Sequence, residues 1–471
     1  MAHNSILDFS YPFPFVSATK QDVIPVIALT EEGLGKLRNK TDKRLLKAHA
    51  FKGKAGQTVP LFSPKGDLEK IYVGITSPMG LYDISVVAEK AMTLIKTKTV
   101  FELSGIDDSE INNACIAWGL ACHAKDRYKS EKSKDIPPTL LLPKEADKTS
   151  VEAHIKSICL IRDMINTPAN DLGPEELANT IKTVAKAHKA SIKIIDNQKT
   201  LEKDFPLVFT VGKASDRAPR LIDMHWGKSK NPKITLVGKG VIYDTGGLNI
   251  KPGQYMKNMK KDMGGAAHVL ALANLIMSMK LPVRLRVIIP AVENAISGPA
   301  FRPGDILQSR KGLTVENTNT DAEGRLILAD ALTLASEEET ELIIDCATLT
   351  GSARAALGPD VPPFFTTNAT IAKELQAVSF LEQDHLWFMP LLDQYNKTIE
   401  SPIADLVNSA GAPGDLIYSA LFLKKFPNKH PDWIHVDMYA WNDHAKAGRP
   451  SGGSDTGLRA MYSYLEKRFS E

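Results

Sequence analysis

The chain has 471 residues, of which 43% are hydrophobic and 24% charged, and its formal net charge at pH 7 is only +3. A chain of this length exceeds one hydrophobic core, so two or three domains are expected. The small net charge predicts neither a nucleic-acid nor a membrane surface. No run reaches the roughly 18 apolar residues of a membrane span. With no signal-peptide pattern and four widely spaced cysteines, the sequence predicts a cytoplasmic protein.

The first third of the chain, residues 1–148, mixes short strand-like runs with helical stretches, which predicts a small N-terminal α/β domain. The strand-like runs are 23–28, 71–75 and 139–142, and the helical stretches are 83–97 and 109–125. Residues 149–168 are predicted to form a connecting helix that Pro168 ends. From 169 to 471, helices alternate with apolar strands. This alternation predicts a larger C-terminal domain with a mostly parallel sheet flanked by helices.

The first stretch with chemical content follows a short apolar run at 234–237, which predicts a buried strand. Lys239 and Asp244 come just beyond this strand, and Lys251 follows them. In open α/β sheets, ligands bind beyond the carboxyl ends of such strands. Asp262 stands before a predicted helix at 266–279, where an isolated aspartate is more often an N-cap than a ligand.

A second charged stretch, Asn319-Thr320-Asp321-Ala322-Glu323-Gly324-Arg325, precedes another predicted helix. Its two carboxylates are suited to divalent metal ions, and its guanidinium is suited to an anion beside them. The same residues also fit a capping box, in which Thr320 and Glu323 satisfy backbone N–H groups at a helix start. Taken alone, the stretch favours the cap.

Taken together, these blocks resemble the leucyl aminopeptidase family, dinuclear-metal exopeptidases also known as cytosol aminopeptidases. The family signature N-T-D-A-E-G-R-L stands at 319–326 without a mismatch. The blocks G-K-G-V-I-Y-D-T-G-G-L at 238–248 and M-K-K-D-M-G-G-A-A at 259–267 also match. The three blocks stand in the family's order and spacing, and the resemblance extends from about Asn166 to the end of the chain.

The resemblance implies an enzyme that releases the first amino acid, leucine-like preferred, from peptides with a free N-terminus. A water molecule activated by two divalent ions, manganese or zinc, would be the nucleophile. The implied metal ligands are Lys239, Asp244, Asp262, Asp321 and Glu323, with Asp244 and Glu323 as bridges. Four carboxylates would offset the four positive charges of two ions. Lys239 would have to lose its proton, which it normally holds to a pKa of about 10.4.

The same resemblance implies that Lys251 and Arg325 are catalytic residues that bind no metal. Lys251 would stabilise the developing oxyanion. Arginine is not a plausible base, and in the family a bicarbonate bound by this arginine is thought to shuttle the proton. Residues 169–471 would then be the catalytic metallo-aminopeptidase domain, and the assembly would be a homohexamer.

Substrate contacts are expected where a predicted strand at 342–347 ends. Thr348, Leu349 and Gly351 follow it, and the resemblance makes them substrate-binding candidates together with Met259. A plain β-turn and a core methionine are the alternatives. Another predicted strand, 433–438, is followed by Tyr439 and Trp441, where many family members have small residues. The preferred first residue of the substrate is therefore left open, as are the roles of Lys261 and Trp441.

Other functions fit the sequence less well. The dinucleotide fingerprint lacks its third glycine, because Tyr243 stands there, and no phosphate-binding G-x-x-x-x-G-K-[ST] occurs. The H-E-x-x-H motif of another class of zinc proteases is absent. Some relatives in the family also bind DNA as regulators. That added role stays open as an alternative, although the modest charge does not favour it.

Overall fold

The computed structural model describes residues 11–123, 127–131, 134–428 and 432–470. The chain divides into two compact units. The smaller unit holds Phe9–Cys159 and a later segment, Asp443–Ser451; the larger one holds Leu160–Asn442 and the chain from Gly452 on. The division falls inside a long helix, α5 (Lys148–Asn166). The return of residues 443–451 to the smaller unit is a feature that the sequence pattern did not indicate.

The smaller unit is built on a six-stranded sheet in the order β1-β6-β5-β2-β4-β3. All neighbouring pairs are parallel except β3 with β4. Its strands are β1 (Phe15–Val16), β2 (Val23–Leu29), β3 (Thr58–Phe62), β4 (Leu68–Gly74), β5 (Val100–Ser104) and β6 (Thr139–Leu141). Its helices are α1 (Glu31–Lys36), α2 (Lys40–Ala48), α3 (Ser85–Leu94), the 3₁₀ helix η1 (Asp108–Glu110) and α4 (Ile111–Ala121).

The larger unit is built on a sheet in the order β16-β15-β18-β14-β9-β11-β8-β7, with β10 pairing β11. The central pairs β18-β14-β9-β11 are parallel, and antiparallel pairing occurs only towards the edges of the described strands. The strands are β7 (Ser191–Ile195), β8 (Arg220–Trp226), β9 (Lys233–Gly238), β10 (Gly240–Asp244), β11 (Arg284–Asn294), β14 (Leu342–Ala347), β15 (Pro363–Thr366), β16 (Trp387–Phe388) and β18 (Trp433–Asp437). Smaller sheets join β12 (Ile306–Gln308), β13 (Thr314–Glu316) and β17 (Leu406–Val407), and pair β19 (Trp441–Asn442) with β20 (Gly452–Gly453).

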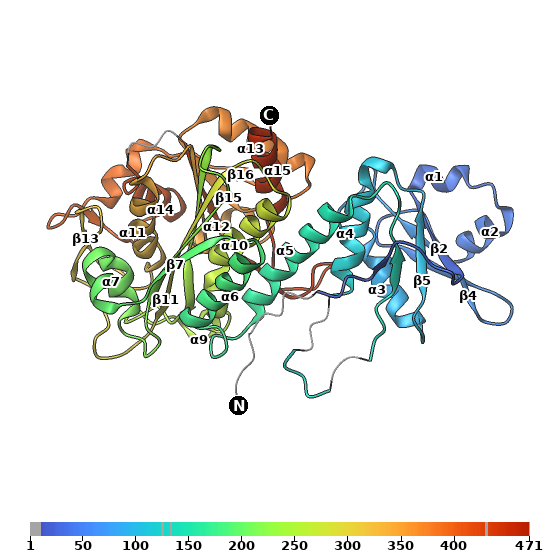
Figure 1. The fold of residues 1–471 in the computed structure, drawn as a ribbon, viewed down its shortest axis with the longest axis horizontal. Helices are drawn as coiled ribbons and strands as arrows, with labels where there is room; N and C mark the ends of the chain where they lie inside the picture. Colours follow the sequence, from blue (N-terminus) through green and yellow to red (C-terminus); the bar gives the residue numbers. More distant parts are fainter. Residues whose placement is uncertain (1–10, 124–126, 132–133, 429–431, 471) are drawn as a thin grey trace. The chain divides into compact units, whose positions relative to one another are not determined.

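Helices cover both faces of this sheet, as Figure 1 shows. One group is α6 (Pro174–Ala187), α10 (Gly264–Ser278), α13 (Ala369–Leu381) and α15 (Leu458–Phe469). The other is α7 (Gln198–Asp204), α8 (Pro206–Gly212), α11 (Gly324–Ser336) and α14 (Asp415–Lys424). Short connecting helices are α9 (Gly253–Met256), η2 (Met259–Met263), α12 (Gly351–Leu357) and η3 (Asp393–Ile399). Every residue of α10 from Gly264 to Met277 is buried, as expected for a helix that is apolar all round.

The predicted fold class is therefore confirmed: a small α/β unit and a larger one whose mostly parallel sheet is flanked by helices. The larger unit has helices on both faces because its central strands are apolar on both sides and must be covered twice. Among the described residues, no helix combines the length and the apolar character needed to cross a membrane.

The two capping interpretations of the acidic residues are wrong. Helix α11 begins at Gly324, and no side chain caps it. The hydroxyl of Thr320 instead donates to the carbonyl of Gly246, 2.6 Å away. Helix α10 begins at Gly264, also without a side-chain cap, and Asp262 lies before it in η2. The carboxylates of Asp262 and Glu323 are therefore available for other partners.

Candidate metal centre

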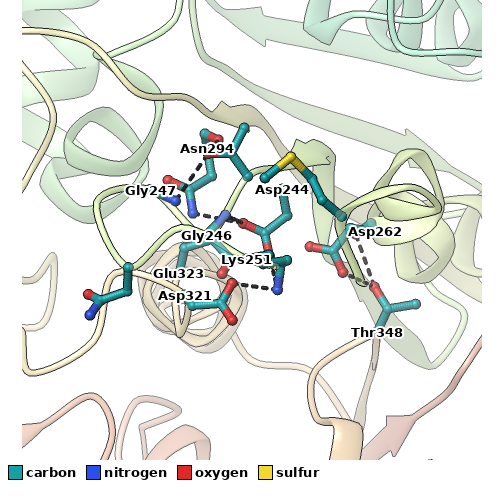
Figure 2. Close-up of polar contacts among 12 residues, drawn as sticks. Asp244, Gly246, Gly247, Lys251, Asp262, Asn294, Asp321, Glu323 and Thr348 are labelled. Carbon is teal, nitrogen blue, oxygen red and sulfur yellow. Dashed lines mark hydrogen bonds and ion pairs between the residues drawn. The ribbon is translucent and has the colours of Figure 1, made fainter. Parts of the chain in front are cut away.

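The predicted site residues meet at the carboxyl ends of the central strands. Lys239 directly follows β9, and Asp244 is the last residue of β10. Asp262 comes from η2, while Asp321 and Glu323 come from the turn that leads into α11. This edge is where parallel α/β sheets bind their ligands, because neighbouring strands end there in loops that diverge. Figure 2 shows carboxylates from these segments pointing toward one another.

Asp244 is held by donors from two different segments. The backbone N–H of Gly246 and the side-chain amide of Asn294 donate to its Oδ1 at 2.9 and 2.8 Å. Its Oδ2 faces the ammonium of Lys251 at 2.9 Å. One oxygen thus fixes the orientation of the carboxylate while the other faces the cluster. Partners of this kind orient metal ligands in proteins.

Asp262 is arranged in the same way. The hydroxyl of Thr348, just past β14, donates to its Oδ1 at 2.7 Å. Its Oδ2 is 2.7 Å from the ammonium of Lys239, which also lies 3.0 Å from Oε1 of Glu323. Lys239 further donates to the carbonyl of Thr348 at 2.9 Å. The loops after β9 and β14 therefore hold Asp262 and Lys239 in place.

Three of the four carboxylates form one compact group. Ligand oxygens of Asp244, Asp262 and Glu323 lie within 4.8 Å of one another, and all three residues are buried. Asp321 is joined to them through Lys251, whose ammonium contacts both Asp321 and Asp244. The structure thus brings all five predicted ligands and Lys251 together.

The charges in this cluster are those of a cation site. Burial first, and then the charge of Asp244, raise the pKa of Asp321 to about 6 even though Lys251 acts against this. The pKa of Glu323 is raised for the same two reasons. Burial lowers the pKa of Lys239, but the surrounding carboxylates outweigh it and raise that pKa overall. The positive charges of Lys239 and Lys251 therefore do not offset the negative charges of the four carboxylates.

The donor set fits divalent metal ions. Among the described residues, Oδ2 of Asp262, Oδ1 of Asp321 and Oε1 of Glu323 are buried oxygens with no properly oriented hydrogen bond. Each forms an ion pair with a lysine ammonium. Carboxylate oxygens are hard ligands suited to such ions. Lys239 completes the set only after losing its proton, which nearby dications favour.

Glycines at two places make the cluster possible. A Cβ on Gly324 would lie 2.5 Å from Cε of Lys239, so any side chain there would push Lys239 out of the cluster. Gly246 and Gly247 have φ of +87° and +61°, a region that other residues rarely adopt. Their turn folds back so that the Gly246 N–H reaches Asp244.

A cavity of about 350 Å³ opens beside the cluster. The four predicted substrate-binding residues, Met259, Thr348, Leu349 and Gly351, all line it. Further lining comes from Lys261, Arg354, Met438 and Tyr439. The cavity thus combines apolar side chains with cations next to the predicted ligands.

Arg325 is placed differently from the other predicted residues. It is not among the described residues that line the cavity. Its guanidinium donates to the carbonyl of Asn408 at 2.7 Å and pairs with Asp415 at 3.1 Å. Its Nε is buried and has no hydrogen-bond acceptor among the described residues. Two of its three nitrogen atoms are thus engaged by the protein itself.

Two residues that orient the site were not predicted from the sequence. Asn294, the last residue of β11, donates to Asp244 and also to the carbonyl of Thr320 at 3.1 Å. Asp437, the last residue of β18, accepts hydrogen bonds from both backbone and hydroxyl groups of Thr350, and from Leu349 N–H at 2.9 Å. A polar residue that ends an apolar strand is the signal that could have identified both.

A larger hollow, about 870 Å³, lies at the opposite ends of β9, β11 and β14. It is lined by charges of both signs, and Lys233 pairs there with Glu338 at 2.5 Å. None of the predicted site residues lines it. We therefore assign the candidate functional site to the smaller cavity.

Fold and site together define an α/β protein with a buried carboxylate–lysine cluster suited to divalent cations. Comparison with known families identifies it further. Residues 159–462 match the model of the cytosol aminopeptidase family, catalytic domain, and residues 24–143 match the M17 aminopeptidase N-terminal domain. The chain belongs to the cytosol aminopeptidase family and is a metal-dependent aminopeptidase, a peptide hydrolase.

Comparisons with individual proteins also support this family. A probable cytosol aminopeptidase of Syntrophotalea carbinolica is 38% identical over 364 residues, which cover 74% of this chain and 73% of the relative. The crystal structure of cytosol aminopeptidase from Coxiella burnetii is 41% identical, with a TM-score of 0.90 over 97% of this chain and 99% of that one. The bottromycin maturation enzyme BotP in complex with Mn is 28% identical, with a TM-score of 0.84 over 95% of this chain and 99% of that one.

Proposed function

We propose that this aminopeptidase uses two divalent ions to remove the first residue, leucine-like preferred, from peptides with a free N-terminus. The observation that carries the proposal is the buried group of Asp244, Asp262 and Glu323, whose ligand oxygens lie within 4.8 Å of one another. The manganese complex of the related BotP supports manganese as one of the ions, with zinc as the other candidate.

The five ligands would be Lys239, Asp244, Asp262, Asp321 and Glu323. Asp244 and Glu323 are the proposed bridging ligands, as the family resemblance implies, and both belong to the buried carboxylate group. When bound, the ions would bring the pKa of water toward neutrality and polarise the scissile carbonyl. The hydrogen bonds from Asn294 and Thr348 would keep two of the ligands oriented throughout.

Lys251 is the proposed electrostatic catalyst. Its ammonium is largely buried at the edge of the cluster and lines the cavity. Burial lowers its pKa, but the four neighbouring acids raise it overall, so Lys251 keeps its proton and can donate to an oxyanion. A preorganised donor in a buried site stabilises developing negative charge far better than water does.

The first side chain of the substrate would lie against the cavity wall. Met259, Leu349 and Met438 give that wall an apolar surface, which supports the leucine-like preference. Backbone groups of Thr348, Leu349 and Gly351 would contact the peptide. Asp437 holds their loop by accepting hydrogen bonds from Leu349 and Thr350.

Arg325 is the proposed holder of a bicarbonate. The Asn408 carbonyl and Asp415 each accept one hydrogen bond from a terminal guanidinium nitrogen. Nε and a second N–H on each terminal nitrogen remain as donors among the described contacts. Bicarbonate held there would supply a carrier for the proton, since arginine itself is not a plausible base.

We also propose that the protein is cytoplasmic, since two of the relatives named above are cytosol aminopeptidases. The homohexamer is proposed on the family resemblance alone. An added DNA-binding role is not proposed. The net charge of +3 gives no electrostatic support for it.

The test is hydrolysis of leucine amide and short peptides by protein loaded with manganese or with zinc. We expect release of the first residue and its loss on chelation. An N-acetylated peptide of the same sequence is the matched control, and it should stay intact. Rapid cleavage of the acetylated peptide would show that the free amino group is not required.

A further inference from the structure

The cavity beside the cluster is lined by a buried lysine, Lys261, whose ammonium has no polar partner among the described residues. Lys261, which adjoins Asp262, is only 7% exposed and lines the cavity. Within the part of the chain that the structure describes, its ammonium makes no hydrogen bond and no ion pair, and its close contact is the ring of Tyr439 at 4.7 Å. The nearby acid, Asp262, directs its own oxygens to Thr348 and Lys239 instead.

A second cation faces the same ring. The guanidinium of Arg354, on α12, lies 4.5 Å from the centroid of Tyr439 and also lines the cavity. It makes no ion pair with any described residue. Arginine keeps its charge at every physiological pH. The ring of Tyr439 therefore contacts two cations at the cavity wall.

The energetics of these contacts point to a missing anion. A cation–ring contact contributes about 0.5–2 kcal/mol. Burying a charge without a partner costs several kcal/mol, so the ring alone does not offset the burial of Lys261. Among the described residues, the acids of the cluster make their ion pairs with Lys239 and Lys251 and none with Lys261. Two divalent ions would add four positive charges and neutralise what remains of the acids' negative charge. The wall is therefore left with excess positive charge.

We propose that Lys261 and Arg354 form an anion subsite that binds a carboxylate of the substrate next to the scissile bond. The inference rests on the proposed peptide-hydrolase function and adds a substrate class to it. The carboxylate has two possible sources: the side chain of an aspartate or glutamate at the first position, or the free C-terminus of a dipeptide. Tyr439 is the positioning residue of this subsite.

Two substrate pairs separate these sources. Glutamic acid α-amide against glutamine α-amide changes only the side-chain charge, and leucyl-glycine against leucyl-glycine amide changes only the C-terminal charge. We expect native protein to favour the carboxylate member of at least one pair by about tenfold to a hundredfold in kcat/KM. Lys261→Met and Arg354→Met should each bring that ratio back toward one. Both kcat/KM values of a pair are measured on the same preparation. A partial loss of metal or of folded protein therefore lowers both values equally and leaves their ratio unchanged.

Lys260→Met is the matched control. Its ammonium is also near an aromatic ring, Trp441 at 5.7 Å, but it donates to the carbonyl of Asn166 at 2.7 Å and does not line the cavity. This variant should keep the native ratio. If both pairs show ratios near one in the native protein, the subsite does not exist.

A binding measurement keeps the inference separate from the proposed function. Calorimetric titration of the metal-loaded protein with glutamate and with glutamine compares two ligands that are not turned over. Tighter glutamate binding that Lys261→Met abolishes supports the side-chain source even if no amide is cleaved. Equal affinity for the two amino acids, together with equal kcat/KM for the two dipeptide forms, overturns the proposal. Failure to cleave any unblocked substrate overturns the proposed function alone.

Discussion

Lys251 and Asp244 lie 2.9 Å apart, yet we expect opposite consequences when each is replaced. Lys251→Met removes a donor without removing a ligand, so metal content should be kept while kcat falls by about a hundredfold to a thousandfold. Elemental analysis measures the metal content and leucine amide kinetics measure kcat, both on the same sample. Metal loss in this variant would mean that Lys251, and not Lys239, is the ligand.

Asp244→Asn is the matched comparison. It removes a charge from the centre of the cluster and should lose metal and activity together, with kcat/KM lower by on the order of a thousandfold, because bound metal contributes several kcal/mol to the rate. Asp305→Asn, at an exposed pair with Arg302, should change neither quantity. A fully active Asp244→Asn protein would contradict the ligand assignment.

At the level of the elements, strands β8 and β11 are joined by an ion pair within the sheet. Asp223 accepts two hydrogen bonds from Arg286, at 2.9 and 2.8 Å, and both residues are buried. Burial raises the pKa of Asp223, but hydrogen bonds from His225 and Arg286 outweigh this and lower it to about 2. Lys193, paired in register on β7, and Glu338, 3.7 Å from Arg286, are the other charges nearby.

This depressed pKa makes stability depend on pH. A carboxyl whose folded pKa lies below its unfolded value of about 3.9 stabilises the fold above that value, and the contribution disappears as pH falls toward 2. Asp223→Asn should therefore cost about 2 kcal/mol at pH 7. The difference from native protein should shrink between pH 4 and pH 2. Urea midpoints across this range measure it, and a difference that stays constant with pH would contradict the pairing.

At the scale of the whole molecule, the number of chains in the assembly can be measured directly in solution. The proposed homohexamer predicts a mass six times that of the chain, by light scattering coupled to size-exclusion chromatography. The mass should stay unchanged across a tenfold dilution, because large obligate interfaces dissociate little. A single-chain mass at every concentration would rule the hexamer out.

Local patterns in the sequence identified most of the fold. The strand predicted at 342–347 is present as Leu342–Ala347, and the alternation of strands and helices predicted the mostly parallel sheet. Helix starts were less predictable. Thr320 and Glu323 match a capping box, but Thr320 bonds to Gly246 and Asn249 because a distant segment competes for its hydroxyl.

By itself, the sequence determined the family resemblance, the fold class and the residue types of the site, because these depend on short blocks and on periodicity. Only the tertiary structure decided which groups meet. Asn294 and Asp437 orient the site from strand ends far away in the chain, and Asp415 pairs with Arg325. That Lys261 forms no ion pair with any described residue is likewise visible only in the folded chain, because its neighbours come from segments that are distant in sequence.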